Sequence, residues 1–343
     1  MGATVVLSQA NNLRLHNCHI KIHEATMEAP DNASSSHEGN VSVKVAVRAR
    51  PLSSSEKAQG CRDILRLDRE TVDAGGDTRR FQYDYAFGTD SSQTEIYEKT
   101  TVPLLNRVYE GFNATILAYG QTGSGKTFTM GTAFGGNGGA DADASAGIIP
   151  RAVHELFDRR ARIAPQRKVD IRLSFLEIHH EEIHDLLVAS ASQATASGND
   201  TTSSDTAKAN GQGLAVRESA EGGVVVAGLS AHTVESAAEV EQLLARGTLN
   251  RATGSTQMNA QSSRSHAVCT LTLEVGFAQQ GEGGSGSSEE GAVEHVGKLT
   301  LVDLAGSERA KRTGASGNRL KEGISINRGL VCASLSLHCF CLV

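Results

Sequence analysis

The stretch that decides the fold reads Gly120-Gln-Thr-Gly-Ser-Gly-Lys126-Thr127. It matches G-x-x-x-x-G-K-[ST], in which glycines let backbone N–H groups close around phosphate oxygens. The lysine supplies positive charge for the terminal phosphates, and the threonine hydroxyl is a ligand for Mg²⁺. The apolar run at 114–119 predicts a buried strand directly before the loop, and we expect a helix after it. This context favours a phosphate-binding loop over a plain glycine-rich turn.

A second, acidic element supports the phosphate site. The apolar run 298–304 contains Asp303 and is followed by Ala305-Gly306. An aspartate at the end of a strand beside a phosphate-binding loop organises Mg²⁺ in P-loop nucleoside triphosphatases. Taken alone, Asp303 is equally consistent with an ordinary strand-end residue. Together with the loop it indicates a nucleotide site.

The composition limits the class of protein. The chain has 343 residues, of which 39% are hydrophobic, so it contains enough apolar material for a sizeable core. A net charge of −6 gives no indication of nucleic-acid binding. Six cysteines without C-x-x-C pairing predict a reducing compartment. No apolar run reaches the ~18 residues of a membrane span, so we expect a soluble intracellular protein.

Alternating strands and helices predict an α/β sheet. Period-2 and short apolar runs predict strands, and 3.6-residue periodicity predicts helices. The expected strands are 41–47, 114–119, 169–178, 268–275 and 296–302, and the expected helices are 94–109 and 234–249.

Low-complexity segments surround and interrupt this compact part. Residues 1–40 are polar and aperiodic, which predicts a disordered N-terminal extension. Gly-, Ala-, Ser- and Asp-rich stretches predict three surface insertions. These insertions are expected at 133–147, 189–213 and 277–295, and they account for much of the glycine excess.

Read together, four motifs resemble those of the kinesin motor domain. Segment 118–127 resembles its P-loop, segment 259–266 its switch I and segment 301–309 its switch II. The element Arg48-Ala49-Arg50-Pro51 resembles the adenine-side motif of that family.

The resemblance covers residues 41–330, and segment 87–130 is most similar to chromokinesin-type members. It implies a P-loop NTPase fold, with a central mixed, mostly parallel β-sheet flanked by helices on both faces. It also implies ATP and Mg²⁺ as the ligands of the site.

The resemblance further implies a role for each matching residue. Arg48, Pro51 and Phe128 would flank the adenine, and the Gly306 amide would sense the γ-phosphate. Arg264 and Glu308 would pair when the switches close. The implied nucleotide-binding set is Arg48, Pro51, Gly120, Gln121, Thr122, Gly123, Ser124, Gly125, Lys126, Thr127 and Phe128. The implied Mg²⁺ ligands are Thr127 and, through water, Ser263 and Asp303; the implied catalytic set is Ser263, Arg264, Gly306 and Glu308.

A microtubule-stimulated ATPase of the cytoplasm and cytoskeleton is the activity that the resemblance implies. A basic stretch beside switch II suits an acidic filament, although by charge alone a solvated loop is the simpler interpretation. We expect neither a membrane nor a direct nucleic-acid partner, and a homodimer only if a longer protein supplies a C-terminal coiled coil. The residues expected to contact the microtubule are Lys311, Arg312, Arg319 and Lys321.

Two other functions remain open at this point. Residues 331–343 are apolar and Cys-rich and do not resemble the family, so we expect a divergent tail and an incomplete motor domain. The chain would then be a truncated, catalytically impaired nucleotide-binding fragment. The other alternative is a zinc hydrolase, because His180-Glu181-Glu182-Ile183-His184 fits H-E-x-x-H. That motif needs a helix to bring both histidines together, and the strand-like run before it argues against one.

Overall fold

The computed structural model describes residues 2–10, 43–75, 80–132, 142–164, 166–179, 181–188, 213–219, 224–253, 263–277 and 293–308. Within these residues, no helix combines the length and the apolar character needed to cross a membrane.

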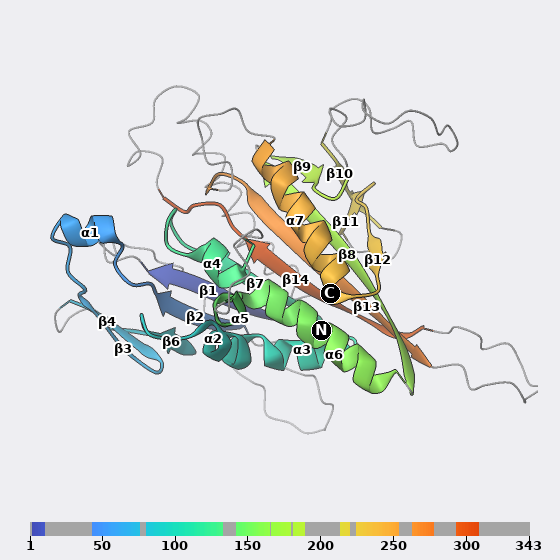
Figure 1. Ribbon diagram of the computed structural model, residues 1–343, viewed down its shortest axis with the longest axis horizontal. Helices are drawn as coiled ribbons and strands as arrows, with labels where there is room; N and C mark the ends of the chain where they lie inside the picture. The colour runs from blue at the N-terminus through green and yellow to red at the C-terminus, as the bar shows by residue number, and fades with distance from the viewer. Residues whose placement is uncertain are drawn as a thin grey trace, which may run out of the picture.

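A nine-stranded mixed sheet forms the centre of the molecule (Figure 1). Its order is β12-β8-β13-β14-β7-β1-β2-β6, with β9 paired to β8. The pairings from β14 through β7, β1 and β2 to β6 are parallel, and the remaining pairings are antiparallel. The strands are β1 Gly2–Ala10, β2 Val43–Ala49, β6 Tyr85–Phe87, β7 Asn113–Tyr119, β8 Arg167–His179, β9 Glu182–Asp185, β12 His232–Val234, β13 His266–Phe277 and β14 Val293–Asp303.

The helices pack on the sheet face that carries Ile116 and Leu301. Buried side chains of α2, α3, α6 and α7 share one core with these strand residues, and Figure 1 shows the four helices gathered on one side of the sheet. Alternate strand residues face the other way, so Leu117 and Val302 form a small separate cluster with Leu304. The helices are α1 Ser54–Ala58, α2 Gln93–Thr100, α3 Val102–Tyr109, α4 Lys126–Met130, α5 Ala142–Ser145, α6 Ile148–Ile163 and α7 Ala237–Thr253.

Two small antiparallel sheets lie beside the central one. They comprise β3 Leu65–Asp68, β4 Thr71–Ala74 and β5 Arg80–Gln82 in the first, and β10 Ala215–Glu218 and β11 Val224–Ala227 in the second. The predicted fold class, a P-loop NTPase fold with a central mixed sheet and packed helices, is confirmed. Within the described residues, four strand pairings are parallel and four are antiparallel, so the sheet is not mostly parallel as predicted. The four helices of the main core lie on one face of the sheet, whereas the prediction placed helices on both faces.

The N-terminal strand differs from the sequence prediction. Residues 2–10 form β1, which pairs in parallel with β2 on one side and with β7 on the other. The disordered extension predicted over 1–40 therefore does not hold for this segment. The Thr-Val-Val-Leu run in it has high β propensity, and a position inside a sheet gives backbone groups partners on both sides. The polar composition of the forty residues as a whole concealed that local signal.

Several predicted boundaries also shift. The helix expected at 94–109 is two helices, because the chain turns at Thr101 and Pro103 stands in the first turn of α3. Strands β13 and β14 run to Phe277 and from Val293, so the third insertion is narrower than predicted. Helix α5 lies within the first predicted insertion. Most of the insertions and all of the 331–343 tail lie outside the described residues.

Candidate functional site

The loop between β7 and α4 closes on its own backbone. Gly120, Gly123 and Gly125 have φ angles of 154°, 75° and 102°, a region that glycine enters at little cost. Lys126 is 7% exposed, and its Nζ donates to the carbonyl oxygens of Gly120 at 2.8 Å and Gln121 at 3.0 Å. Burial lowers the pKa of the Lys126 ammonium from its ordinary value. The loop thus holds a poorly solvated positive charge, the condition under which an anion is attracted most strongly.

Strand β14 brings Asp303 against the first turn of α4. Its Oδ2 accepts from Thr127 Oγ1 at 2.9 Å and from Thr132 Oγ1 at 3.3 Å. Its Oδ1 is buried and has no hydrogen-bond partner among the described residues. A carboxylate oxygen without a partner beside a threonine hydroxyl is a donor set that suits Mg²⁺. The residues present therefore fit the metal that the sequence predicts.

The charges around Asp303 also favour a bound cation. Burial raises the pKa of this carboxyl, while the positive charge of Arg251, the Thr127 hydroxyl and Lys126 oppose the rise. A cation placed at Oδ1 adds to the opposing side and favours the charged carboxylate.

Backbone groups after β14 bond to the first residue of β13 and to the segment just before it. The Gly306 N–H donates to the carbonyl of Ser263 at 2.9 Å, and the Ala305 N–H donates to Nδ1 of His266 at 3.0 Å. Burial, aided by nearby positive charge, lowers the pKa of His266 to about 4. The imidazole is therefore neutral near pH 7, as an acceptor nitrogen requires. Switch I and switch II residues are thus directly connected.

Glu308 connects the same segment to the P-loop. Its carboxylate accepts from the Thr122 N–H at 2.9 Å and from Thr122 Oγ1 at 2.5 Å. A Cβ at Gly306 would overlap the Glu308 carboxylate and the Thr122 hydroxyl, so a larger residue there would displace these side-chain groups. The structure thus shows Glu308 bonded to Thr122, and its predicted pairing with Arg264 stays a prediction.

Two of the predicted adenine-side residues, Arg48 and Phe128, contact each other. Arg48 Nη1 donates to Gln93 Oε1 at 2.8 Å and to Thr129 Oγ1 at 2.7 Å, and its guanidinium lies 5.3 Å from the centroid of the Phe128 ring. Phe128 is 54% exposed, and Pro51 is also exposed. Arg48 and Phe128 thus lie next to each other, and their place beside an adenine stays a prediction. The buried Gln93 was not predicted, and no motif marks it.

Arg50 links the P-loop to helix α1 by hydrogen bonds to both. Its Nε donates to the Gly123 carbonyl at 2.7 Å, and its two terminal nitrogens bind Glu56 at 2.8 and 2.6 Å. Glu56 also closes the capping box of α1 with Ser53. Sequence reasoning missed Glu56, although Ser-x-x-Glu before a helix is a readable signal.

Comparison with known proteins agrees with this geometry. A family model described as the kinesin motor domain matches residues 48–336. The chain belongs to the kinesin motor domain family. It is 43% identical over 296 residues to the kinesin-like protein KIN-4A of Gossypium hirsutum, covering 84% of this chain and 28% of that protein.

The chain is also similar to a chromosome-associated kinesin. It is 41% identical over 293 residues to the chromosome-associated kinesin KIF4 of Xenopus laevis, covering 85% of this chain and 22% of that protein. The solved structure of a fast kinesin superposes with a TM-score of 0.67 at 32% identity, covering 83% of this chain and 72% of that one. The matched part of the chain spans about a quarter of the length of the KIN-4A and KIF4 proteins.

The zinc motif does not take the form that a zinc hydrolase needs. Strand β8 ends at His179, Glu181 has a φ of 68°, and His184 lies in β9 opposite Glu177. The segment is thus a tight hairpin and offers no helix to hold two histidines on one face, although His180 itself lies outside the described residues. Within the described ranges, no group of three or more metal-ligating side chains occurs.

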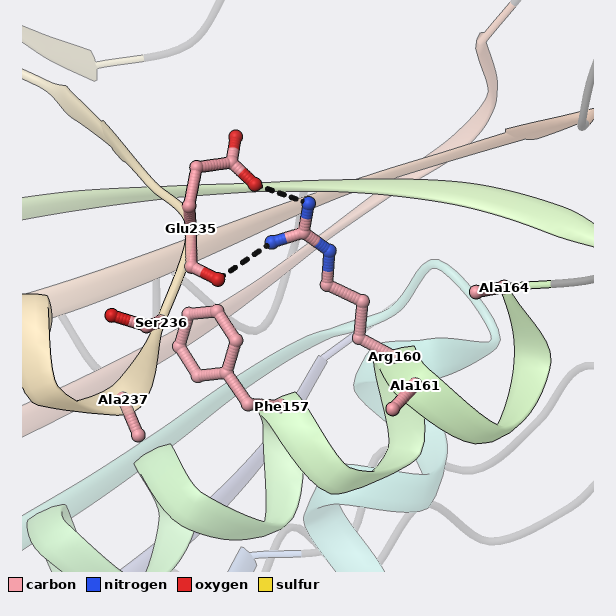
Figure 2. Close-up of a pocket in the computed structure, with 7 residues that line it drawn as sticks. All are labelled: Phe157, Arg160, Ala161, Ala164, Glu235, Ser236 and Ala237. Atoms are coloured by element: carbon pink, nitrogen blue, oxygen red, sulfur yellow. Dashed lines mark hydrogen bonds and ion pairs between the residues drawn. The ribbon is translucent and has the colours of Figure 1, made fainter.

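The predicted track-binding residues Lys311, Arg312, Arg319 and Lys321 lie outside the described residues. A cavity of about 340 Å³ lies where the end of α6 meets the start of α7, lined by alanines, Phe157 and an Arg160–Glu235 ion pair of 2.6 Å (Figure 2). None of its lining residues belongs to the kinesin motifs, and we assign it no function.

Proposed function

We propose that this kinesin domain hydrolyses Mg-ATP and couples the movement of its switches to microtubule binding. One observation carries the proposal: Thr127, which follows the buried Lys126 in the P-loop, bonds to Asp303, whose Oδ1 has no partner among the described residues. A buried positive charge and a metal-binding carboxylate side by side are what a nucleoside triphosphate requires.

The ATP site combines residues from several elements. Lys126 neutralises the terminal phosphates, and the P-loop amides around Gly123 enclose them. Thr127 would hold the metal, with Asp303 and Ser263 acting through water. Bound Mg²⁺ supplies the counter-charge that makes the terminal phosphoryl group susceptible to attack.

The adenine lies at the opposite end of the loop. Phe128 offers an exposed ring next to Arg48, and Pro51 would flank the base as the family resemblance implies. Apolar and aromatic faces of this kind accept a flat base.

The switch residues respond to the terminal phosphate. Glu308 accepts from the Thr122 amide, a donor of the kind that phosphate oxygens also accept from. When that amide turns to a phosphate, Glu308 leaves it and becomes available to Arg264. The Gly306 N–H likewise exchanges the Ser263 carbonyl for the γ-phosphate. Hydrolysis reverses both exchanges, as in other switch NTPases.

The microtubule is the partner that follows from the family. The fast kinesin was described for its ATPase mechanism and its interactions with microtubules. For this chain we propose contact through Lys311, Arg312, Arg319 and Lys321, and a location on cytoplasmic microtubules. Their positive charges suit the acidic surface of such a filament.

Steady-state ATPase assays with and without microtubules test the proposal. We expect turnover that microtubules increase, and Lys126→Ala to abolish it in both conditions. Lys298→Ala is the matched control, because this exposed lysine lies on β14 and takes no part in the site. Absence of turnover in the wild-type chain, with or without microtubules, would leave only the impaired nucleotide-binding fragment.

A further inference from the structure

Gln93, the first residue of α2, belongs to none of the motifs that define the site. It is 5% exposed, and its amide makes three hydrogen bonds. Oε1 accepts from Arg48 Nη1 at 2.8 Å, and Nε2 donates to the carbonyls of Phe128 at 2.7 Å and Ser145 at 3.3 Å. These partners fix which end of the amide is oxygen, because a guanidinium only donates and a carbonyl only accepts. One buried side chain therefore connects β2, α4 and α5.

Arg48 is a half-buried cation whose acceptors are neutral groups. Its Nη1 uses both hydrogens, one on Gln93 Oε1 and one on Thr129 Oγ1 at 2.7 Å, and its Nη2 lies 3.5 Å from the Ser91 carbonyl. Burial lowers the pKa of this guanidinium. Because none of these acceptors among the described residues is charged, hydrogen-bond direction and not an ion pair sets the orientation of the flat group.

The same amide holds the backbone of Phe128. Helix α4 ends two residues later, at Met130, so the Phe128 carbonyl is among the last four, which an α-helix leaves without an intrahelical partner. The Nε2 of Gln93 supplies that partner. The Phe128 ring is 54% exposed and lies 5.3 Å from the Arg48 guanidinium. Both residues that are proposed to flank the base are thus held by one side chain.

The residue type suits this double task. A carboxamide carries an acceptor and two donor hydrogens at one planar end, and so it can bind a cation and two carbonyls at once. A glutamate would turn a second oxygen toward the carbonyls of Phe128 and Ser145, and a lysine would bring a second positive charge to Arg48. An apolar side chain would leave all three buried groups without this partner, which is costly.

We propose that Gln93 is a positioning residue for the base of the nucleotide: it fixes the Arg48 guanidinium and the Phe128 backbone, so that both residues present their flat groups to the base. This inference rests on the proposed Mg-ATP function. The hydrogen bonds of Lys126 and Thr127 do not involve Gln93. Binding of the phosphate chain should therefore not depend on it.

Two ligands separate the base from the phosphate chain. Isothermal titration calorimetry of the full chain in Mg²⁺ measures its affinity for ADP and for inorganic pyrophosphate, which has the same two phosphates but no base. Gln93→Met keeps the length of the side chain and removes all three hydrogen bonds. We expect its ADP affinity to fall roughly tenfold, the effect of about one net hydrogen bond, and its pyrophosphate affinity to stay at the wild-type level.

Asn250→Leu is the matched control. Asn250 lies in α7, and its amide donates to the Leu186 carbonyl at 2.9 Å, so this variant also removes an amide that holds a backbone carbonyl. We expect it to keep the wild-type ratio of ADP to pyrophosphate affinity. Thermal unfolding of the ligand-free chains shows whether each variant is folded.

Gln93→Glu carries the test should Gln93→Met fail to fold. Glutamate keeps the oxygen that faces Arg48 but loses both donors. Its added charge acts on both ligands through their phosphates, so the ratio of the two affinities reports on the base. We expect a smaller fall in that ratio than for Gln93→Met, because Arg48 stays in place.

A double-mutant cycle tests the route through Arg48. Residues that act through one contact are not additive, so Gln93→Met should weaken ADP binding less in an Arg48→Ala background than in the wild type. Equal effects in both backgrounds, or equal losses for ADP and pyrophosphate, would overturn the positioning role. A wild-type chain that binds pyrophosphate as tightly as ADP would overturn it too, while leaving the phosphate site in place. A wild-type chain that binds neither ligand would instead refute the proposed function, and this inference with it.

Discussion

Replacing Asp303 with asparagine should change stability and ligand binding in opposite directions. The side chain is 2% exposed, and burial raises its pKa despite the opposing charges of Arg251 and Lys126. A raised pKa means that the folded chain prefers the neutral acid. The charged carboxylate therefore destabilises the ligand-free fold at pH 7, and this penalty disappears below the unfolded-state pKa of about 3.9.

Both magnitudes follow from the environment of the carboxylate. Asparagine keeps a polar group at the unpartnered position but removes the buried charge, and each pKa unit that burial adds corresponds to about 1.4 kcal/mol. Ligand-free Asp303→Asn should therefore be more stable than wild type at pH 7 by about 1–3 kcal/mol. Loss of a residue that orients the metal's ligands typically weakens binding about 10–100-fold, which is about 1.4–2.7 kcal/mol. Binding of Mg-nucleotide should weaken by that factor.

Urea unfolding of the ligand-free chain at pH 7 and pH 3, with nucleotide titration in Mg²⁺, measures both effects. The stability gain should shrink at pH 3. Asp185→Asn is a matched control, because Asp185 accepts from the Leu187 and Ser230 N–H groups at 2.9 and 2.7 Å, away from the P-loop. That change should destabilise the chain and leave magnesium-dependent binding intact. A destabilised Asp303→Asn with wild-type Mg-nucleotide affinity would refute the reasoning.

Three further predictions concern the scaffold. The hydrogen bonds from Arg50 lower the pKa of Glu56 to about 2. In denaturant unfolding, wild type should therefore be more stable than Glu56→Gln by a full amount above about pH 4.3, and the difference should vanish as the pH falls toward 2. A difference that does not change with pH would contradict this. Gly297→Ala places a Cβ in overlap with the Val108 carbonyl of α3, so it should lower the free energy of unfolding by about 1–3 kcal/mol; an unchanged value would show that α3 yields. Deleting residues 1–10 removes β1, which pairs with β2 and β7. Because β2 then loses a neighbouring strand, limited proteolysis should cut residues 43–75 faster than in wild type. Unchanged cleavage would count against the observed sheet order.

The parts of the site that the sequence predicts are those that one local motif encodes. The P-loop glycines, Lys126 and Asp303 follow from residue type, spacing and the strands around them. Gln93 could not be found this way, because it and its partners Arg48 and Phe128 lie on different elements and meet only in the fold.

The same distinction applies to the fold. The strand-loop-helix context of the P-loop is local and was predicted, but β1 depends on parallel partners that lie far along the chain. The helix after the P-loop was also predicted, but its length was not. Gly131 ends α4 in a left-handed conformation, and its backbone packs against Gly147 just before α6 begins.

The central claim is that nucleotide state and microtubule binding are coupled. Co-sedimentation of the full chain with microtubules, in a non-hydrolysable ATP analogue and in ADP, tests it most directly, since coupled sites must change each other's affinity. We expect different microtubule affinities in the two nucleotides, and no such difference for Lys126→Ala. Equal affinity of the wild-type chain in both nucleotides would contradict it.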